Sequence, residues 1–320
     1  MKKLILIIIL TINVAAAKAQ QLPLYNQYKL NSFLINPAVA GSQNYTPLRI
    51  ISHMNLLGFD NAPQTNIISF HSRISRVGKF DHTGESLNRF PVLRNGRFGI
   101  GSYLYSDKSG PFSRAGINFS MAYHLTLNDK KNHNLSIGIS GNIYQFKIGN
   151  LTENEDYSGF DPTLTTSSDA QFFADLNAGI LFYSHKYYFG ISSAQILENS
   201  YKYESNSDDN KMVRHYFING AYEFDLSKNF SIEPNSTAKA IINSPVVYDF
   251  GVNFYFKKNF WLGGSWSNSE SFFAKTGFRY KNFIAAYSFG YSLSNIVSYS
   301  SGIHEILIGF NFNEKKRFLN

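Results

Sequence analysis

Few residues in this sequence have the types and spacing that chemistry requires. The run Asn36-Pro37-Ala38 is the signature of water channels, but that chemistry needs two copies on half-helices within a helical bundle. This chain has one copy, so an Asn-Pro turn is the better interpretation. The pair His304-Glu305 begins like a zinc-protease motif, but the residue four positions after His304 is Ile308 rather than histidine.

Other histidines and acids define no clearer site. His53 and His71 lie on neighbouring predicted strands and could meet, but no third ligand accompanies them. Asp81 and His82 are adjacent, so on a strand they would point to opposite faces. The chain has no cysteine, which excludes thiolate metal sites and disulfides. We therefore predict no catalytic residue, no cofactor and no metal ion.

The composition favours strands that are apolar on one side only. Charged residues make up 16% of the chain, against about 25% in soluble domains, and aromatic residues also reach 16%. The mean hydropathy of −0.22 is too low for a bundle of membrane-spanning helices. The net charge of +8 is scattered rather than gathered into a basic patch. The sequence therefore gives little support for a nucleic-acid partner.

The first nineteen residues read as an export signal. Lys2 and Lys3 precede the apolar run 4–12, and Ala17-Lys18-Ala19 has the small-x-small pattern of a cleavage site. The apolar run is shorter than the ~20 residues that a spanning helix needs. We therefore expect cleavage after Ala19 and export across the inner membrane.

Beyond the leader, apolar and polar residues alternate with a period of two. In the segment 246–256, every second residue from Val246 to Phe256 is apolar or aromatic, and Asp249 and Asn253 lie on the opposite face. Such alternation is typical of membrane-spanning barrel strands, with one face toward lipid and the other toward water. About fourteen such segments occur, near 48–54, 64–73, 96–105, 113–127, 134–148, 171–184, 187–194, 212–225, 230–242, 246–256, 260–267, 271–280, 283–291 and 303–313.

We therefore predict an all-β protein, an outer-membrane β-barrel of about 14 antiparallel strands. The barrel spans residues 48–313, and a charged tail follows at 314–320. Connections on one side are short and contain lysine, whereas 149–170 and 195–211 are long and polar. Short turns face the periplasm in such barrels, so we expect both termini there. The long connection 74–95 breaks this pattern, because it falls on the side of the short connections. Trp261 and Trp266 are interpreted as residues of the aromatic belt at the membrane interface.

Residues 20–47 precede the barrel and are too apolar to remain a solvated tail. They contain Tyr25, Tyr28, Phe33, Leu34 and Ile35, each of which gains roughly 1.5–3 kcal/mol on full burial. A fourteen-strand lumen is wide enough to accept such a segment. The segment is predicted either to plug the barrel or to pack on its periplasmic rim.

The mature N-terminus resembles a known family. The stretches 20–28 and 34–42, with later matches at 62–65, 98–101, 261–263 and 300–306, are similar to the PorP/SprF family of outer-membrane proteins. That resemblance singles out ten motif residues whose role is unknown: Tyr25, Asn26, Gln27, Tyr28, Asn36, Pro37, Ala38, Gly41, His304 and Glu305.

The resemblance implies a non-enzymatic role in the type IX secretion and gliding machinery. Members of the family support the secretion or surface retention of a cargo protein with a C-terminal sorting domain, such as a large adhesin. Two other functions remain open from the sequence. One is a transport barrel for small or hydrophobic solutes, and the other is an outer-membrane hydrolase.

Overall fold

The computed structural model describes residues 30–58, 61–74, 97–128, 133–149, 170–200, 212–269, 271–293 and 301–313. The predicted export signal and the charged tail lie outside these ranges. Within them, no helix is both long and apolar enough to cross a membrane.

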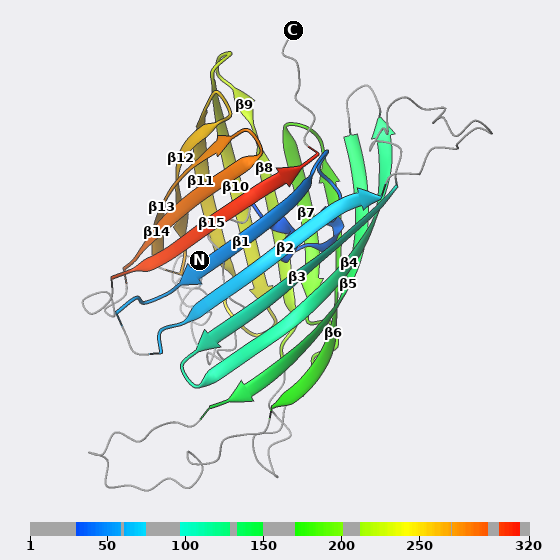
Figure 1. Cartoon of the computed structure of the whole chain (residues 1–320), viewed down its shortest axis with the longest axis vertical. Helices are drawn as coiled ribbons and strands as arrows, with labels where there is room; N and C mark the ends of the chain where they lie inside the picture. The colour runs from blue at the N-terminus through cyan, green and yellow to red at the C-terminus, as the bar shows by residue number, and fades with distance from the viewer. Residues whose placement is uncertain are drawn as a thin grey trace, which may run out of the picture.

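Fifteen strands follow one another along the described chain (Figure 1). They are β1 (Thr46–Met54), β2 (Gln64–Ile74), β3 (Phe98–Ser109), β4 (Phe112–Asn128), β5 (His133–Ile148), β6 (Gln171–Tyr183), β7 (Tyr187–Ala194), β8 (His215–Tyr222), β9 (Phe224–Asp225), β10 (Phe230–Ile241), β11 (Val247–Phe256), β12 (Phe260–Ser267), β13 (Ser271–Tyr280), β14 (Phe283–Ser292) and β15 (Ile303–Phe312). The first begins two residues before the predicted barrel boundary.

The strands form one closed antiparallel barrel. Strands that are neighbours along the chain pair with each other, except β8 and β9, and β15 returns to pair with β1. The predicted strand 212–225 is interrupted at Glu223, but both of its parts, β8 and β9, pair with β10. They therefore occupy one place in the wall, and the barrel has fourteen strands, as predicted.

Alternation separates an apolar outer face from a polar inner face. On β11, the outward Phe250 and Phe254 are 56% and 54% exposed, whereas the inward Asn253 between them is 9% exposed. Strands that show only one face to lipid need this pattern, because successive side chains point to opposite sides. The outer face therefore forms an apolar surface suited to hydrocarbon.

One of the two tryptophans does not lie where the belt interpretation placed it. Trp266 is outward and 38% exposed, but Trp261 points inward and is 6% exposed. Trp261 packs in a cluster with Ile51, Ile67 and Leu307, and a Cβ on Gly277 of the next strand would overlap its indole ring. The belt prediction for Trp261 was wrong because its strand position shares the inward face with Gly263 and Ser265.

The two ends of the barrel differ in their connections. One end, here called the turn end, carries the short connections after β6, β9, β11 and β13. The other, the loop end, carries the long connections after β5 and β7, together with short connections after β3 and β12. The strand order also puts the connection between Ile74 and Phe98 at the turn end. This is the side on which the sequence predicted short connections, so the long connection is an exception to that pattern. Residues 75–96 of that connection lie outside the described residues.

A charged side chain on the outer face should lower the free energy of unfolding far more than one on the inner face at the same depth in the membrane. We expect Phe250→Arg to lower the free energy of unfolding in liposomes by about 2–4 kcal/mol, because its guanidinium would enter hydrocarbon. Ser265 pairs with Gly251, beside Phe250, but is half-buried and faces the lumen. Ser265→Arg is therefore the control, and equal losses for the two variants in urea titrations would contradict this assignment of faces.

Candidate functional site: the N-terminal segment inside the barrel

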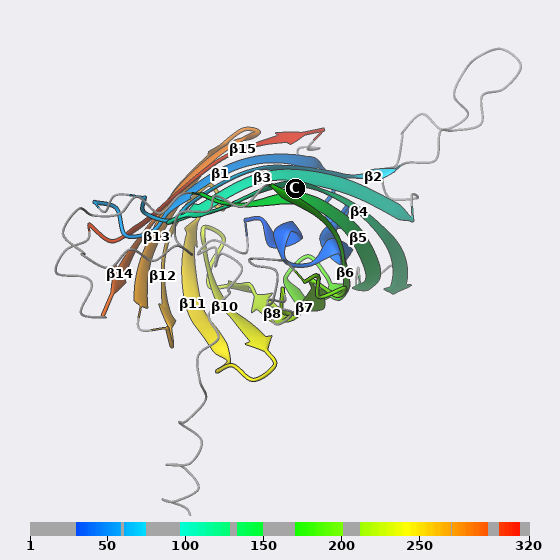
Figure 2. The same cartoon turned by 90° about the horizontal axis from the view of Figure 1, so that it is seen from below.

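The described residues that directly precede β1 lie inside the barrel. We call residues Leu30–Tyr45 the lumen segment; it contains two short 3-10 turns, η1 (Ser32–Leu34) and η2 (Pro37–Val39). Figure 2 shows it within the ring of strands, and η2 contacts β4, β5 and β6. Phe33 is 1% exposed, and Asn36, Ala38 and Ala40 are fully buried. The described part of residues 20–47 therefore belongs to the interior of the molecule.

Its local shape follows from a few residue types. The side-chain oxygen of Asn36 accepts a hydrogen bond from the Ala38 amide at 2.9 Å, which caps η2. Pro37 occupies the first position of that turn, where its missing N–H costs nothing. Gly41 has φ of +73°, a conformation that glycine adopts without steric cost. Asn36-Pro37 and Gly41 thus bend the chain on either side of η2.

Glycines on the inner wall make room for the segment. A Cβ at Gly99 on β3 would overlap the carbonyl oxygen of Ala40, and a Cβ at Gly138 on β5 would overlap the backbone of Ala38. A Cβ at Gly179 on β6 would likewise overlap the Asn36 side chain. The absence of side chains at these positions lets the backbone of the segment approach the backbone of the wall.

Asn36 joins the segment to two strands at once. Its side-chain nitrogen donates to the carbonyl oxygens of Ile180 on β6 at 3.0 Å and Ile191 on β7 at 3.5 Å. One residue earlier, the Ile35 carbonyl accepts from the Ser192 hydroxyl at 2.6 Å. The amide of Asn36 therefore uses both its donor and its acceptor in an interior where an unmade hydrogen bond is costly.

A second set of bonds holds the end of the segment that enters β1. His71 Nδ1 accepts from the Gly41 amide at 3.1 Å, and Arg73 Nε donates to the Gly41 carbonyl at 2.7 Å. The Ala40 carbonyl can only accept, so His124 Nε2, 2.8 Å away, must be the donor to it. The neutral tautomer of His124 with its proton on Nε2 fits this contact.

The remaining contacts of this network match that tautomer. Arg73 Nη2 donates to the Tyr183 hydroxyl at 2.6 Å, and that hydroxyl lies 3.0 Å from His124 Nδ1. The hydroxyl can accept from Arg73 and donate to His124 at the same time. Side chains from β2, β4 and β6 therefore meet around two successive carbonyls of the segment.

The segment also reaches the opposite wall. Leu30 and Leu34 pack against a cluster that includes Ile51 on β1, Trp261 on β12 and Leu307 on β15. Asn31 donates to the Ser69 hydroxyl on β2 at 2.7 Å. Because the same short segment bonds to β6 and β7 and packs on β12 and β15, it crosses the lumen from one wall to the other.

The structure brings only some of the family-motif residues together. Asn36, Pro37, Ala38 and Gly41 lie in the lumen segment, whereas Tyr25, Asn26, Gln27 and Tyr28 fall outside the described residues. Glu305 points inward, 3.1 Å from His53 Nδ1, and His304 points outward, where Nδ1 lies 2.7 Å from the Tyr287 hydroxyl. His304 and Glu305 therefore do not share a site.

The other candidates from the sequence are also separated. His53 pairs with Thr65 in the ladder and His71 pairs with Gly101, so the two histidines lie six positions apart along β2 and cannot share a ligand. Among the described residues, no three His, Cys, Asp or Glu side chains gather where they could hold a metal ion. Asp81 and His82 lie outside the described residues.

Sequence reasoning missed the role of the wall residues that hold the segment, and it considered His71 only as a metal ligand. His71, Arg73 and His124 share an inward face with small residues on their strands, and that face was visible in the alternation. Their contacts with residues 40–41 join positions from 30 to 84 residues apart, for which one sequence carries no signal.

A side chain at Gly99 should displace the lumen segment from the inner wall. We expect Gly99→Val to increase amide hydrogen exchange across residues 30–45 and to lower the free energy of unfolding by about 1–3 kcal/mol, as overpacking does. Gly141 is the matched control, because a Cβ there meets nothing within 4 Å. Unchanged exchange in Gly99→Val, measured by mass spectrometry beside Gly141→Val, would contradict the seating.

Replacing the amide of Asn36 by a carboxylate should also weaken the attachment of the lumen segment to the barrel wall. Asn36→Asp keeps an oxygen for the Ala38 amide but loses the donor and sets a charge against two carbonyls, so we expect a loss of about 1–3 kcal/mol in the free energy of unfolding. Asn44→Asp makes the same chemical change at an exposed position of the segment. Equal stability of the two variants in urea would show that the Asn36 bonds are not needed.

Solved structures similar to this chain are outer-membrane channels and porins. The CymD monoaromatic hydrocarbon channel has 12% identity and a TM-score of 0.48, with 88% of this chain and 93% of that chain covered. Omp33 of Acinetobacter baumannii has 10% identity and a TM-score of 0.43, with 85% and 100% covered. The toluene transporter TodX of P. putida has 9% identity and a TM-score of 0.42, with 89% and 95% covered.

No curated protein matches the sequence. The model of a protein family does: type IX secretion system membrane protein PorP/SprF matches residues 17–310, nearly the whole chain. That family agrees with the resemblance noted at the N-terminus. The chain therefore belongs to the PorP/SprF family of type IX secretion system outer-membrane proteins.

Proposed function

We propose that this barrel is a non-enzymatic component of the type IX secretion and gliding machinery. It supports the secretion or surface attachment of a cargo protein with a C-terminal sorting domain, such as a large adhesin. The supporting observations are the family match over residues 17–310 and a lumen that a segment of the same chain crosses. A barrel whose interior is bonded to its own chain is better suited to docking than to conducting a polypeptide.

The proposed orientation places the turn end and both termini in the periplasm. Short turns face the periplasm and long loops face outward in bacterial barrels. The lumen segment then acts as a plug in a barrel whose turn end faces the secretion machinery. In this arrangement the segment both closes the barrel and presents a surface to the machinery.

The alternative function is a transport barrel for small or hydrophobic solutes. It requires a continuous path through the lumen, so the segment would have to leave its seat or let solutes pass beside it. Asn36 and Gly41 together make bonds to β2, β6 and β7, which opposes such a departure. The two functions therefore differ in the conductance of the intact barrel.

Conductance and secretion should separate the two functions. We expect the intact barrel to be nearly silent in planar bilayers and a variant lacking residues 20–45 to conduct, because the deletion empties the lumen. Barrel assembly of the deletion variant is checked by heat-modifiable migration on a gel. A full-length barrel that conducts small solutes as well as the deletion variant would favour the transport function.

Loss of this chain in its own organism should leave the cargo unsecreted or detached from the surface. Re-expression of the wild-type chain or of Gly141→Val should restore surface cargo, whereas Gly99→Val should restore it poorly. Surface proteins are identified by mass spectrometry after shaving intact cells. Unchanged surface proteins in the deletion strain would refute the proposed role in secretion.

A further inference from the structure

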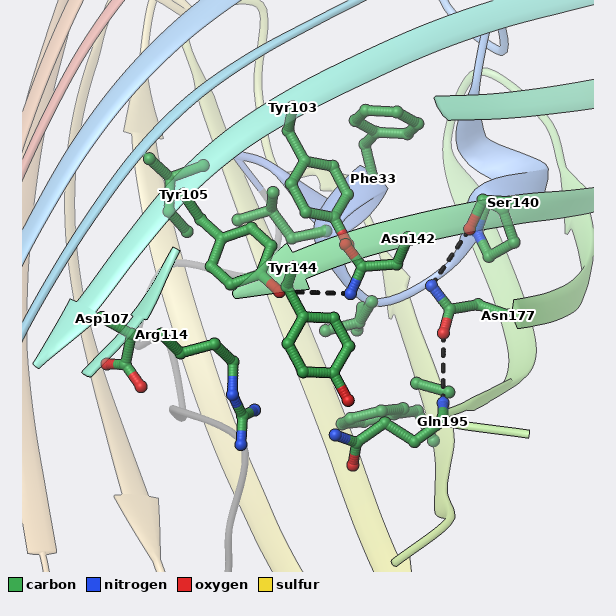
Figure 3. A pocket seen from close by; sticks show the side chains of 16 residues that line it. Phe33, Tyr103, Tyr105, Asp107, Arg114, Ser140, Asn142, Tyr144, Asn177 and Gln195 are labelled. Atoms are coloured by element: carbon green, nitrogen blue, oxygen red, sulfur yellow. Dashed lines mark hydrogen bonds between the residues drawn. The ribbon is translucent and has the colours of Figure 1, made fainter. Parts of the chain in front are cut away.

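A pocket lies between the lumen segment and the inner wall, toward the loop end (Figure 3). Phe33, Leu34, Ile35 and Pro37 of the segment line one side of it. Strands β3, β4 and β5 supply most of the rest, including Tyr103, Tyr105, Arg114, Asn142 and Tyr144. The pocket therefore exists only while the segment is seated.

Arg114 is a cation that pairs with no carboxylate among the described residues. Its Nη2 donates to the sulfur of Met212 at 3.4 Å, and its Nε is buried without a hydrogen-bond partner. Its guanidinium lies 5.4 Å from the ring centroid of Tyr144 and 5.9 Å from that of Phe146. Among the described residues it forms no ion pair. Stacking on rings holds the group in place but leaves its charge and a donor unused.

Asn142, farther along the pocket on β5, adds an unused acceptor. Its nitrogen donates to the Tyr105 hydroxyl at 3.2 Å, but its oxygen is buried and has no partner in the described part of the chain. Buried polar atoms without partners are rare in folded proteins, since each costs about 1–3 kcal/mol. Unused polar groups on two neighbouring strands indicate that something polar belongs in this pocket.

The rest of the pocket is mainly aromatic and apolar. The ring of Phe33 packs edge-on against Tyr103 at a centroid distance of 5.8 Å, and Tyr103 lies 6.0 Å from Tyr105. Phe217 and Ile67 lie on the remaining walls. A few fixed polar groups in an apolar cavity are the usual composition of a small-molecule site.

Asp107 is the one acidic side chain among the residues that line the described pocket. It faces Arg114 in the ladder between β3 and β4, and Figure 3 shows both groups at the same end of the pocket. Its carboxylate accepts from the Thr65 hydroxyl at 2.7 Å instead of pairing with Arg114. The guanidinium thus stays available, while the negative charge nearby would weaken binding of an anion.

From these contacts we propose that the pocket binds a small organic carboxylate with an aromatic or aliphatic body. The carboxylate accepts from the guanidinium of Arg114, and the body lies against Phe33, Tyr103 and Tyr105. A charge-assisted bond of this kind is about twice as strong as one between neutral groups. A neutral ligand would leave the Arg114 charge unused.

Ligand binding should also hold the lumen segment in place. A ligand that contacts both the wall and residues 33–37 binds the seated form better than any form in which the segment has left. Such a ligand shifts the equilibrium toward the seated segment in proportion to its differential affinity. The pocket would thereby couple a small molecule at the loop end to the position of the N-terminal chain.

Calorimetric titration of the full-length barrel in detergent tests the proposal. The probes are benzoate, 3-phenylpropionate and octanoate, with 3-phenylpropan-1-ol as the uncharged match of the second. We expect at least one carboxylate to bind, and 3-phenylpropionate to bind roughly ten- to hundredfold more tightly than the alcohol. Empty detergent micelles provide the background for partition of the probes.

Three variants test whether the carboxylate binds to Arg114. Arg114→Gln should reduce the affinity for 3-phenylpropionate to that of the alcohol, whereas Arg279→Gln, an inward arginine outside the pocket, should leave it unchanged. Asp107→Asn should tighten binding of the carboxylate, because it removes a like charge. If Arg114→Gln fails to assemble, the comparison of acid with alcohol and the Asp107→Asn result decide.

Several outcomes would overturn the proposal. They are no binding by any of the three carboxylates, equal affinity for the acid and the alcohol, or weaker binding of 3-phenylpropionate by Asp107→Asn, which would show that the Asp107 carboxylate does not repel the ligand. Hydrogen exchange gives an independent readout, since a bound carboxylate should slow exchange across residues 30–45. Faster or unchanged exchange at saturation would show that the site does not include the segment.

Discussion

The structure depends on the inability of hydrocarbon to hydrogen-bond the protein backbone. Every strand placed in lipid must therefore find partners on both of its edges, and only a closed barrel provides them. Here closure occurs where β15 meets β1 and where β10 meets β11, so the described strands leave no unpaired edge. Fourteen strands then enclose an interior wider than the inward side chains of an eight-strand barrel can fill.

The same constraint explains why the interior accepts a piece of backbone. A segment inside the lumen brings carbonyls and amides away from bulk water, and each must be paired. The wall supplies these pairs through His71, Arg73 and His124 at one end of η2 and through Ser192 and the strand carbonyls at the other. Glycines at the points of closest approach complete the fit, because a single Cβ would separate the paired groups.

The sequence predicts the wall of this barrel much better than its contents. Alternation has a fixed period of two, and lipid makes each outward position apolar, so the fourteen strands and the faces of residues such as Phe250 and Asn253 follow from local pattern. Contacts across the lumen have no such pattern. Trp261 and Trp266 lie on opposite faces of one strand, but only the packing of Trp261 with Ile51 and Leu307 shows which of the two is inside. Likewise, Gly99 and Gly138 look like ordinary strand glycines until Ala38 and Ala40 lie against them.

The lumen segment contacts wall residues toward both ends of the barrel. Toward the loop end, Phe33 and Pro37 line the pocket that contains Arg114; a few residues later, Ala40 and Gly41 bond to His124 and Arg73 before the chain enters β1. Residues 33–41 thus contact both sets of wall residues along a continuous stretch of chain. Interactions that favour the seated segment at one set also favour it at the other, because both need the same position of the same backbone. A closed wall and a single segment crossing the lumen are sufficient for such coupling, and no movement of the strands is required.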